Sequence, residues 1–351
     1  MTATVAPPAR AAVTLPPNFF AAVMGTGILA VAATALPWQL PGRRPFALAM
    51  WLLAASLLVA LTAATLTHWR RHPATARGYH RDPVTVHFYG AVPMAIMTVG
   101  TGTLLVGRDV LGSATAVAIA WPLWVVGTVG GLVTAVAVPF RRRYPATEAF
   151  GGWLMPVVPP TVSASGGALL VPHTPPGAAR EAMLLGCHGL LLAGIVPAGA
   201  VIALVVRRWR RHGPLPARLA PTWFIVLGPL GQSVTAACLL AAAGGSRAIA
   251  LVYGLPVLAV ALVWFAVAAR LVLRAAGTGL PFSPAWWSFT FPVGTCATGA
   301  AGLAKLTGSD ALAALAVALF AGLLLAWTTV AIATVRARQT LVVAGPVSRA
   351  E

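Results

Sequence analysis

Ten long apolar stretches follow one another along this sequence, and they constrain the chain to a bundle of membrane-spanning helices. A helix needs roughly 20 predominantly apolar residues to cross the hydrocarbon core of a bilayer. The mean hydropathy of +0.86 and the charged fraction of 9% also lie outside the range of soluble globular proteins. The stretches are centred near Leu29, Leu57, Met97, Val125, Val162, Leu192, Gln232, Val260, Ala297 and Leu319. We therefore expect an all-α membrane protein with ten transmembrane helices in one domain (16–336), between a disordered N-terminal tail (1–15) and a cytoplasmic C-terminal tail (337–351).

A second pattern groups the stretches in pairs. In five places an aromatic residue, or a histidine beside one, is followed six positions later by Gly or Pro: Phe19 and Gly25, His87 and Pro93, Trp153 and Pro159, Trp223 and Pro229, Trp286 and Pro292. The second members stand at positions 25, 93, 159, 229 and 292, so they recur every 63 to 70 residues. That period is close to two membrane crossings with their loops. It predicts five copies of one helical hairpin, arranged as a ring around a central pore.

The basic residues are distributed unevenly between the two sets of loops. Of the 24 Lys and Arg residues, 18 fall in the two tails and in the loops that follow even-numbered stretches. Short cytoplasmic loops are enriched in Lys and Arg, so both termini are predicted to be cytoplasmic. The net charge of +18 is thus explained by topology and not by nucleic-acid binding. It also favours contact with anionic membrane lipid and attraction of anions to the cytoplasmic mouth.

The odd-numbered stretches carry hydroxyl groups and small residues, whereas the even-numbered stretches consist almost wholly of Ala, Leu and Val. Such residues also serve helix packing alone. Their recurrence in every odd stretch favours a shared polar path. A proline inside a helix frees a carbonyl one turn earlier, which a membrane tolerates beside protein or a water-filled cavity. The sequence therefore predicts kinked odd helices that line the pore through Gly25, Thr26, Gly27, Pro93, Thr98, Pro159, Ser163, Pro229, Ser233, Pro292 and Thr295.

Ionisable residues are scarce within the stretches. The acidic residues other than the last residue of the chain fall at or beyond the ends of the stretches: Asp82, Asp109, Glu148, Glu181 and Asp310. A proton-coupled carrier typically has a buried Asp, Glu or His, and His188 in the sixth stretch is better explained as a packed, hydrogen-bonded histidine. Lys305, at the end of the ninth stretch, either attracts anions or extends to the interface. A path of hydroxyls and backbone dipoles without acids favours an anion over a cation.

Motifs of soluble enzymes are missing from the sequence. It has no paired carboxylates, no Cys/His spacing typical of a metal site and no nucleotide-binding loop in a suitable context. Four histidines (His68, His72, His80 and His87) gather around one predicted cytoplasmic loop, with a spacing too irregular for a metal site. We expect no cofactor and no metal, and a membrane-embedded enzyme is a weak hypothesis.

Three segments resemble a known family. They are similar to segments of the tellurite-resistance/dicarboxylate transporter (TDT) family. The segments are Leu15–Pro16–Pro17–Asn18–Phe19–Phe20, Met24–Gly25–Thr26–Gly27–Ile28 and Trp286–Trp287–Ser288–Phe289–Thr290–Phe291–Pro292. That family includes bacterial TehA, malate permeases, sulfite pumps and slow anion channels. The Met-Gly-Thr-Gly motif is closer in sequence to the malate and sulfite branch than to TehA. The resemblance covers about 15–335, nearly the whole chain.

The resemblance implies ten helices in five hairpins around a pseudo-five-fold pore, lined by the odd-numbered helices and commonly found in a homotrimer. It also implies a phenylalanine on the ninth helix that plugs the pore. Phe291 is the matching position, and Phe289 is the alternative if the helix is rotated.

We therefore expect a channel or carrier for small anions in a bacterial plasma membrane, with C4-dicarboxylates such as malate, or sulfite, as substrates. A proton-coupled dicarboxylate carrier is the alternative within transport. A membrane-embedded enzyme or a scaffold without transport activity is the hypothesis from a different class.

Overall fold

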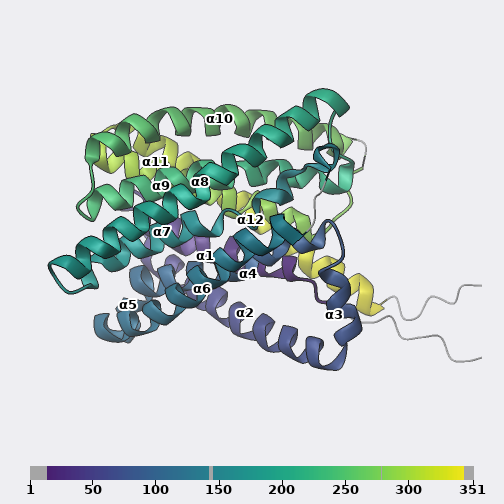
Figure 1. Ribbon diagram of the computed structural model, residues 1–351, viewed down its shortest axis with the longest axis horizontal. Coiled ribbons are helices and arrows are strands. Elements are labelled where there is room, and N and C mark those ends of the chain that lie inside the picture. The colour runs from purple at the N-terminus through teal and green to yellow at the C-terminus, as the bar shows by residue number, and fades with distance from the viewer. Residues whose placement is uncertain (1–13, 142–144, 278, 344–351) are drawn as a thin grey trace, which may run out of the picture.

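The computed structural model describes residues 14–141, 145–277 and 279–343 and is helical throughout, with no strand in these ranges (Figure 1). The α-helices are α1 (Phe20–Ala35), α2 (Arg43–Arg71), α3 (Pro73–Tyr79), α4 (Ala91–Gly102), α5 (Arg108–Leu111), α6 (Ser113–Arg141), α7 (Pro159–Leu170), α8 (Ala178–His212), α9 (Leu227–Ala242), α10 (Arg247–Gly277), α11 (Phe291–Thr307) and α12 (Asp310–Val343). Most of the predicted N-terminal tail lies outside the described residues. At the other end α12 continues to Val343, into the predicted C-terminal tail.

Eight helical segments in the described ranges are long and apolar enough to cross a membrane. They fall into two groups by burial. In the segments that contain α1, α4 and α9, between 67% and 83% of the apolar window is buried, against 17% to 28% for the segments of α2, α6, α8, α10 and α12. The remaining long elements, α7 with 12 residues and α11 with 17, are shorter and buried along most of their length. The chain is therefore an α-helical, multi-pass membrane protein with an inner and an outer set of helices.

The inner helices contact one another in a closed order. Helix α1 packs on α4, α4 on α7, α7 on α9, α9 on α11, and α11 on α1 again. Each outer helix packs on the inner helix that precedes it in the chain: α2 on α1, α6 on α4, α8 on α7, α10 on α9 and α12 on α11. The helices run side by side along the long axis of the molecule, with α10 on one flank and α2 on the opposite flank (Figure 1). The sequence thus folds into successive inner–outer pairs.

The aromatic-to-breaker pattern marks the start of each inner helix. Each aromatic residue or histidine of the pattern lies in a 3-10 turn: Phe19 in η1 (Pro17–Phe19), His87 in η2 (Thr85–Gly90), Trp153 in η5 (Gly151–Leu154), Trp223 in η7 (Ala217–Val226) and Trp286 in η8 (Pro284–Phe289). The prolines are then the first, second or third residue of the α-helix that follows. The first N–H groups of an α-helix have no intrahelical partner, so proline is tolerated there. The expectation that these prolines kink the interiors of the helices is therefore wrong.

A glycine lies at each junction between neighbouring inner segments. A Cβ atom built on any of them would fall within 3 Å of the neighbour: Gly27 against Thr98, Gly90 against the Met155 carbonyl, Gly151 against the Thr222 carbonyl, Gly231 against the Cys296 amide and Gly25 against Thr290. Membrane helices associate mainly by close packing, and small residues let their backbones approach. These glycines therefore hold the inner helices in contact all the way round.

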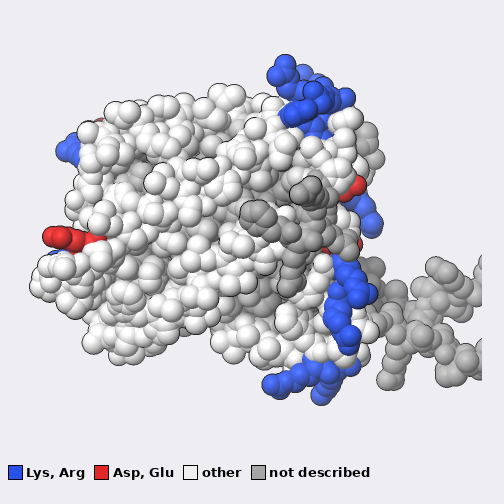
Figure 2. All heavy atoms as spheres, in the orientation of Figure 1, with Lys and Arg blue, Asp and Glu red and all other residues white. Residues whose placement is uncertain are grey.

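Lys and Arg side chains gather at one end of the molecule, the end at which α3 lies, and the long flank seen in Figure 2 carries almost none. Beside α3, the carboxylate of Asp82 accepts hydrogen bonds from the amides of Val84 and Thr85 at 3.1 and 2.6 Å, and so fixes the start of η2. Partial burial works to raise the pKa of Asp82, but these hydrogen bonds outweigh it and lower the pKa below its usual value.

Replacing Gly231 with Ala is expected to destabilise the protein. The new methyl group would lie 2.5 Å from the amide nitrogen of Cys296, so α9 and α11 would have to separate. Overpacking of this kind costs about 1–3 kcal/mol. Thermal unfolding in detergent, followed by loss of the monodisperse peak in size-exclusion chromatography, measures the effect.

The matched control is Gly199→Ala on the outer helix α8. Gly199 is exposed, and a Cβ atom there would meet nothing within 4 Å. Because alanine is a better helix former than glycine, this variant should be as stable as the unchanged protein. Equal melting temperatures for the two variants would contradict the account of the α9–α11 contact.

Candidate functional site

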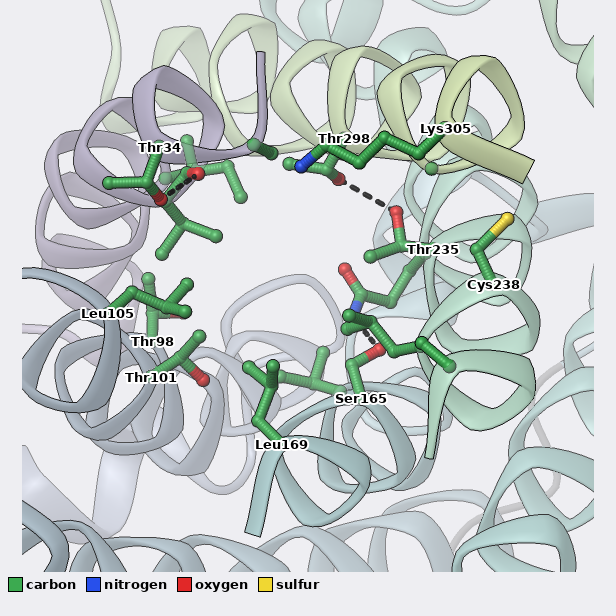
Figure 3. A pocket seen from close by; sticks show the side chains of 18 of the residues that line it. Thr34, Thr98, Thr101, Leu105, Ser165, Leu169, Thr235, Cys238, Thr298 and Lys305 are labelled. Atoms are coloured by element: carbon green, nitrogen blue, oxygen red, sulfur yellow. Dashed lines mark hydrogen bonds between the residues drawn. The ribbon is translucent and has the colours of Figure 1, made fainter. Parts of the chain in front are cut away.

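A cavity of about 340 Å³ lies among the inner helices. Its wall comes mainly from the C-terminal halves of α1, α4, α7, α9 and α11, with Val162, Gln232 and Phe291 from the first halves of their helices. The segment around Leu105 and the starts of α2 and α5 also contribute. The side chains labelled in Figure 3, among them Thr98, Ser165, Thr235 and Thr298, surround an open centre. A single cavity is therefore shared by all five inner helices.

The mouth of this cavity is basic. Arg44, Arg108 and Lys305 line it from α2, α5 and α11. An ion pair joins Arg44 Nη2 to Asp109 Oδ1 at 2.5 Å. Lys305 is exposed and extends along the edge of the opening on the α11 side (Figure 3). Because Asp109 neutralises one of the three cations, the mouth keeps an excess of positive charge.

The middle of the cavity is lined by polar side chains without formal charge. Gln232 Nε2 on α9 donates a hydrogen bond to Ser165 Oγ on α7 at 2.7 Å. The hydroxyls of Thr235 and Thr298 lie 2.7 Å apart and join α9 to α11. Thr98 on α4 completes this set, which is buried in the protein and accessible only through the cavity. The middle of the cavity therefore has a polar surface without formal charge.

Phe291 forms the floor of the large cavity. Its side chain is 5% exposed, and it is the one residue that lines both the large cavity and a second cavity of about 30 Å³. The small cavity is apolar, with Met24, Met94 and Met155 among its lining residues. It lies among the N-terminal ends of the inner helices. The ring of Phe291 therefore separates two spaces that follow one another along the inner helices.

Several residues proposed from the sequence lie at these cavities. Thr98, Phe291 and Lys305 line the large cavity, and Pro292 lines the small one. Phe289 lines neither. Its ring packs edge-on against Phe224 with a centroid separation of 5.1 Å.

Other residues proposed as pore lining instead contact neighbouring helices. Thr26 Oγ1 accepts a hydrogen bond from Trp327 Nε1 at 3.0 Å, and Ser233 Oγ accepts one from Tyr253 Oη at 2.8 Å. Ser163 Oγ donates to the Pro159 carbonyl on its own helix. Thr295 Oγ1 donates to the Pro292 carbonyl.

The remaining members of that set are packed against other helices. Gly25 faces Thr290 and Gly27 faces Thr98, whereas Pro93 and Pro159 lie against glycines of the outer helix α6. Pro229 is buried in α9 and lines neither cavity.

Some residues at the site were not singled out from the sequence. Thr34, Arg44 and Arg108 belong to this group. Other polar lining residues lie in the odd-numbered stretches whose hydroxyl and polar side chains the sequence indicated, but they were not among the residues proposed as pore lining: Thr101, Ser165, Gln232, Thr235 and Thr298. The sequence spacing could have identified Thr298. It lies seven residues after Phe291 and seven before Lys305, so the three residues share one face of α11. Arg44 and Arg108 had no such signal, since Arg44 follows another arginine and Arg108 precedes Asp109 in the short segments between the apolar stretches, and no spacing relates them to the inner helices.

The histidines are used in packing. His87 is buried and stacks on Trp153 with a centroid separation of 5.7 Å. His68 Nε2 lies 3.2 Å from Tyr79 Oη, and His188 Nδ1 lies 2.8 Å from the Leu184 carbonyl. Within the described ranges no group of three His, Cys, Asp or Glu side chains is placed to hold a metal ion.

Comparison with known proteins gives consistent matches. The model of a family described as voltage-dependent anion channel matches residues 14–335. An uncharacterised transporter of Methanocaldococcus jannaschii is 27% identical over 288 residues, covering 79% of this chain and 80% of its own length.

Fungal relatives have a stated activity. A sulfite efflux pump of Arthroderma otae is 23% identical over 308 residues, covering 82% of this chain and 81% of the pump, and one of Trichophyton rubrum is 22% identical over a stretch of the same length. Proteins of this kind are channels or transporters and not enzymes. The chain therefore belongs to the voltage-dependent anion channel family, the TDT family that its sequence resembles, and it is a membrane protein of anion transport.

Proposed function

We propose that this protein conducts small oxyanions, with sulfite as the first candidate substrate, through a central pore closed by Phe291. The observation that carries the proposal is the position of Phe291 between two cavities on the same axis of inner helices. A ring that rotated away from this position would join them. The sulfite efflux pumps among the relatives support the choice of sulfite.

In this proposal, ten helices cross the membrane as five hairpins around a pseudo-five-fold pore. The closed order of contacts among α1, α4, α7, α9 and α11 supports that arrangement. It requires the short helices α7 and α11 to complete their crossings together with the 3-10 turns that precede them. The assembly proposed from the family resemblance is a homotrimer.

A passive pathway fits the site better than proton-coupled transport. No acidic side chain or histidine is among the residues that line either cavity, and proton-coupled carriers rely on such groups. C4-dicarboxylates such as malate remain the second candidate substrates, since a cavity of about 340 Å³ has room for them.

The basic mouth concentrates anions before they reach the neutral middle of the cavity. Positive potential at the mouth of a cleft raises the local concentration of anions and their rate of capture. We assign the end that bears α3 and the larger share of basic residues to the cytoplasm of a bacterial cell, following the excess of Lys and Arg in cytoplasmic loops. The large cavity then opens on the opposite, extracytoplasmic face.

Replacing Phe291 with Ala is expected to raise anion flux because it removes the ring that separates the two cavities. Sulfite efflux from proteoliposomes should increase roughly tenfold or more, equivalent to a barrier lower by at least about 1.4 kcal/mol. The matched control is Phe289→Ala, which removes the same kind of ring two residues earlier in the chain, where it packs on Phe224. An increase with Phe289→Ala, and none with a correctly folded Phe291→Ala, would exclude Phe291 as the plug.

Removing the positive charges of the mouth should slow uptake at low ionic strength. We expect the pair Arg108→Gln and Lys305→Gln to lower anion influx about threefold or more at roughly 0.01 M salt, where the Debye length is about 30 Å. The difference should shrink near 1 M salt, where the Debye length is about 3 Å. Arg180→Gln, outside the cavity lining, is the control. A reduction that does not change with salt would contradict the electrostatic role.

Cysteine labelling in intact cells tests the assigned orientation. The background variant has Cys238, which lines the large cavity, replaced by Ala. A membrane-impermeant maleimide should label Glu181→Cys at the start of α8 and leave Arg77→Cys in α3 unlabelled until the cells are opened. The reverse labelling pattern would place α3 outside the cell and invert the topology.

A further inference from the structure

Gln232 differs chemically from every other residue in the middle of the large cavity. Apart from the three cations of the mouth, it is the only residue lining the cavity whose side chain has N–H groups. It is 5% exposed, and its Nε2 donates to Ser165 Oγ at 2.7 Å. A carboxamide nitrogen carries two hydrogens, and the bond to Ser165 uses one of them. The amide can therefore offer a second donor to a solute.

Three of the hydroxyl groups that line the cavity are already used as donors, whereas Thr101, one turn nearer the mouth than Thr98 on α4, lies outside this set. Thr98 donates to the Met94 carbonyl at 2.7 Å, Thr298 to the Thr295 carbonyl at 3.0 Å and Ser165 to the Thr161 carbonyl at 3.3 Å. A hydroxyl has one hydrogen, so in this arrangement these groups present lone pairs to a solute. Lone pairs do not replace the water molecules that an anion loses. Gln232 is thus the main source of a neutral donor at this depth.

The position of Gln232 along the cavity follows from its neighbours. The bond between Thr235 and Thr298 places these two residues at the same level on α9 and α11. Gln232 precedes Thr235 by one turn, which is about 4.5 Å along the helix axis, in the direction of Phe291. On α11 the distance from Thr298 back to Phe291 is about 10 Å. Gln232 therefore lies between the threonine pair and the aromatic floor.

We propose that Gln232 is the specificity-determining residue of the pathway and donates its free N–H to an oxygen of the permeating oxyanion just above Phe291. This inference rests on the proposed function. Dehydration is costlier for a strongly hydrated anion such as sulfite than for a weakly hydrated one such as nitrate. A donor fixed next to the aromatic floor replaces one lost water molecule and so favours the strongly hydrated ion.

Two substitutions remove the donor in different ways. Gln232→Leu keeps an apolar side chain of similar bulk, and Gln232→Met keeps the length of the unbranched chain. Each variant is measured with and without Phe291→Ala, in proteoliposomes loaded with sulfite or with nitrate. We expect the ratio of sulfite to nitrate flux to fall roughly tenfold in both, the loss expected for one hydrogen bond to a charged group. A merely structural role would change both fluxes together and leave the ratio unchanged.

The control carries the same chemical change outside the cavity. Gln39→Leu removes an exposed glutamine that accepts a hydrogen bond from Arg43, and the flux ratio should not change. Gln232→Glu adds a negative charge at the proposed contact and should abolish flux of both anions.

The outcomes separate the two proposals. Absence of any anion flux, with Phe291 present or replaced by Ala, would overturn the proposed function. Anion flux with an unchanged ratio in folded Gln232→Leu and Gln232→Met would overturn the role of Gln232 alone.

Discussion

Close approach of the inner helices is the constraint on which the rest of the structure depends. Each junction between neighbouring inner segments contains a glycine whose missing side chain is filled by the neighbour, and at Gly90, Gly151 and Gly231 the neighbouring atom belongs to the backbone. Lipid is as apolar as Leu or Val, so membrane helices gain little from burying apolar side chains and depend on such packing. The inner helices pack in a closed ring, and a cavity of about 340 Å³ remains where their small and hydroxyl-bearing side chains face the middle of that ring. Phe291, the large side chain at its floor, separates this space from the smaller one beyond.

The small number of free hydrogen-bond donors explains why the cavity suits passage of an anion better than tight binding of one. The hydroxyls of Thr98, Ser165 and Thr298 donate their hydrogens to carbonyls of their own helices, which satisfies those groups inside the membrane. Charged groups occur only at the mouth, where Asp109 neutralises Arg44. An anion thus meets attraction at the mouth, one amide donor at Gln232 and an aromatic floor. In the proposed pathway, a site of this composition would release the ion as readily as it admits it, which rapid conduction requires.

The apolar pattern predicted the helical class and the inner and outer character of the helices, and the family resemblance singled out Phe291. Neither predicted the rotation of each inner helix. Thr26 and Ser233 are as polar as Thr98 and Thr235, yet their oxygens accept hydrogen bonds from Trp327 and Tyr253 of outer helices. A buried Trp or Tyr requires a partner for its polar group, and those partners are residues that the sequence alone assigns to the pore. The prolines had a similar ambiguity, because the residues themselves do not distinguish a kink from the first turn after a 3-10 segment.

The central claim, that one path runs through both cavities and is interrupted at Phe291, is tested most directly by measuring which positions a small charged thiol reagent reaches from the side of Lys305. In a background with Cys238 replaced by Ala, the account predicts rapid modification of Thr298→Cys, and modification of Met24→Cys only when Phe291 is also replaced by Ala. Equal reactivity of Met24→Cys with and without Phe291, or no reaction of Thr298→Cys from that side, would contradict it.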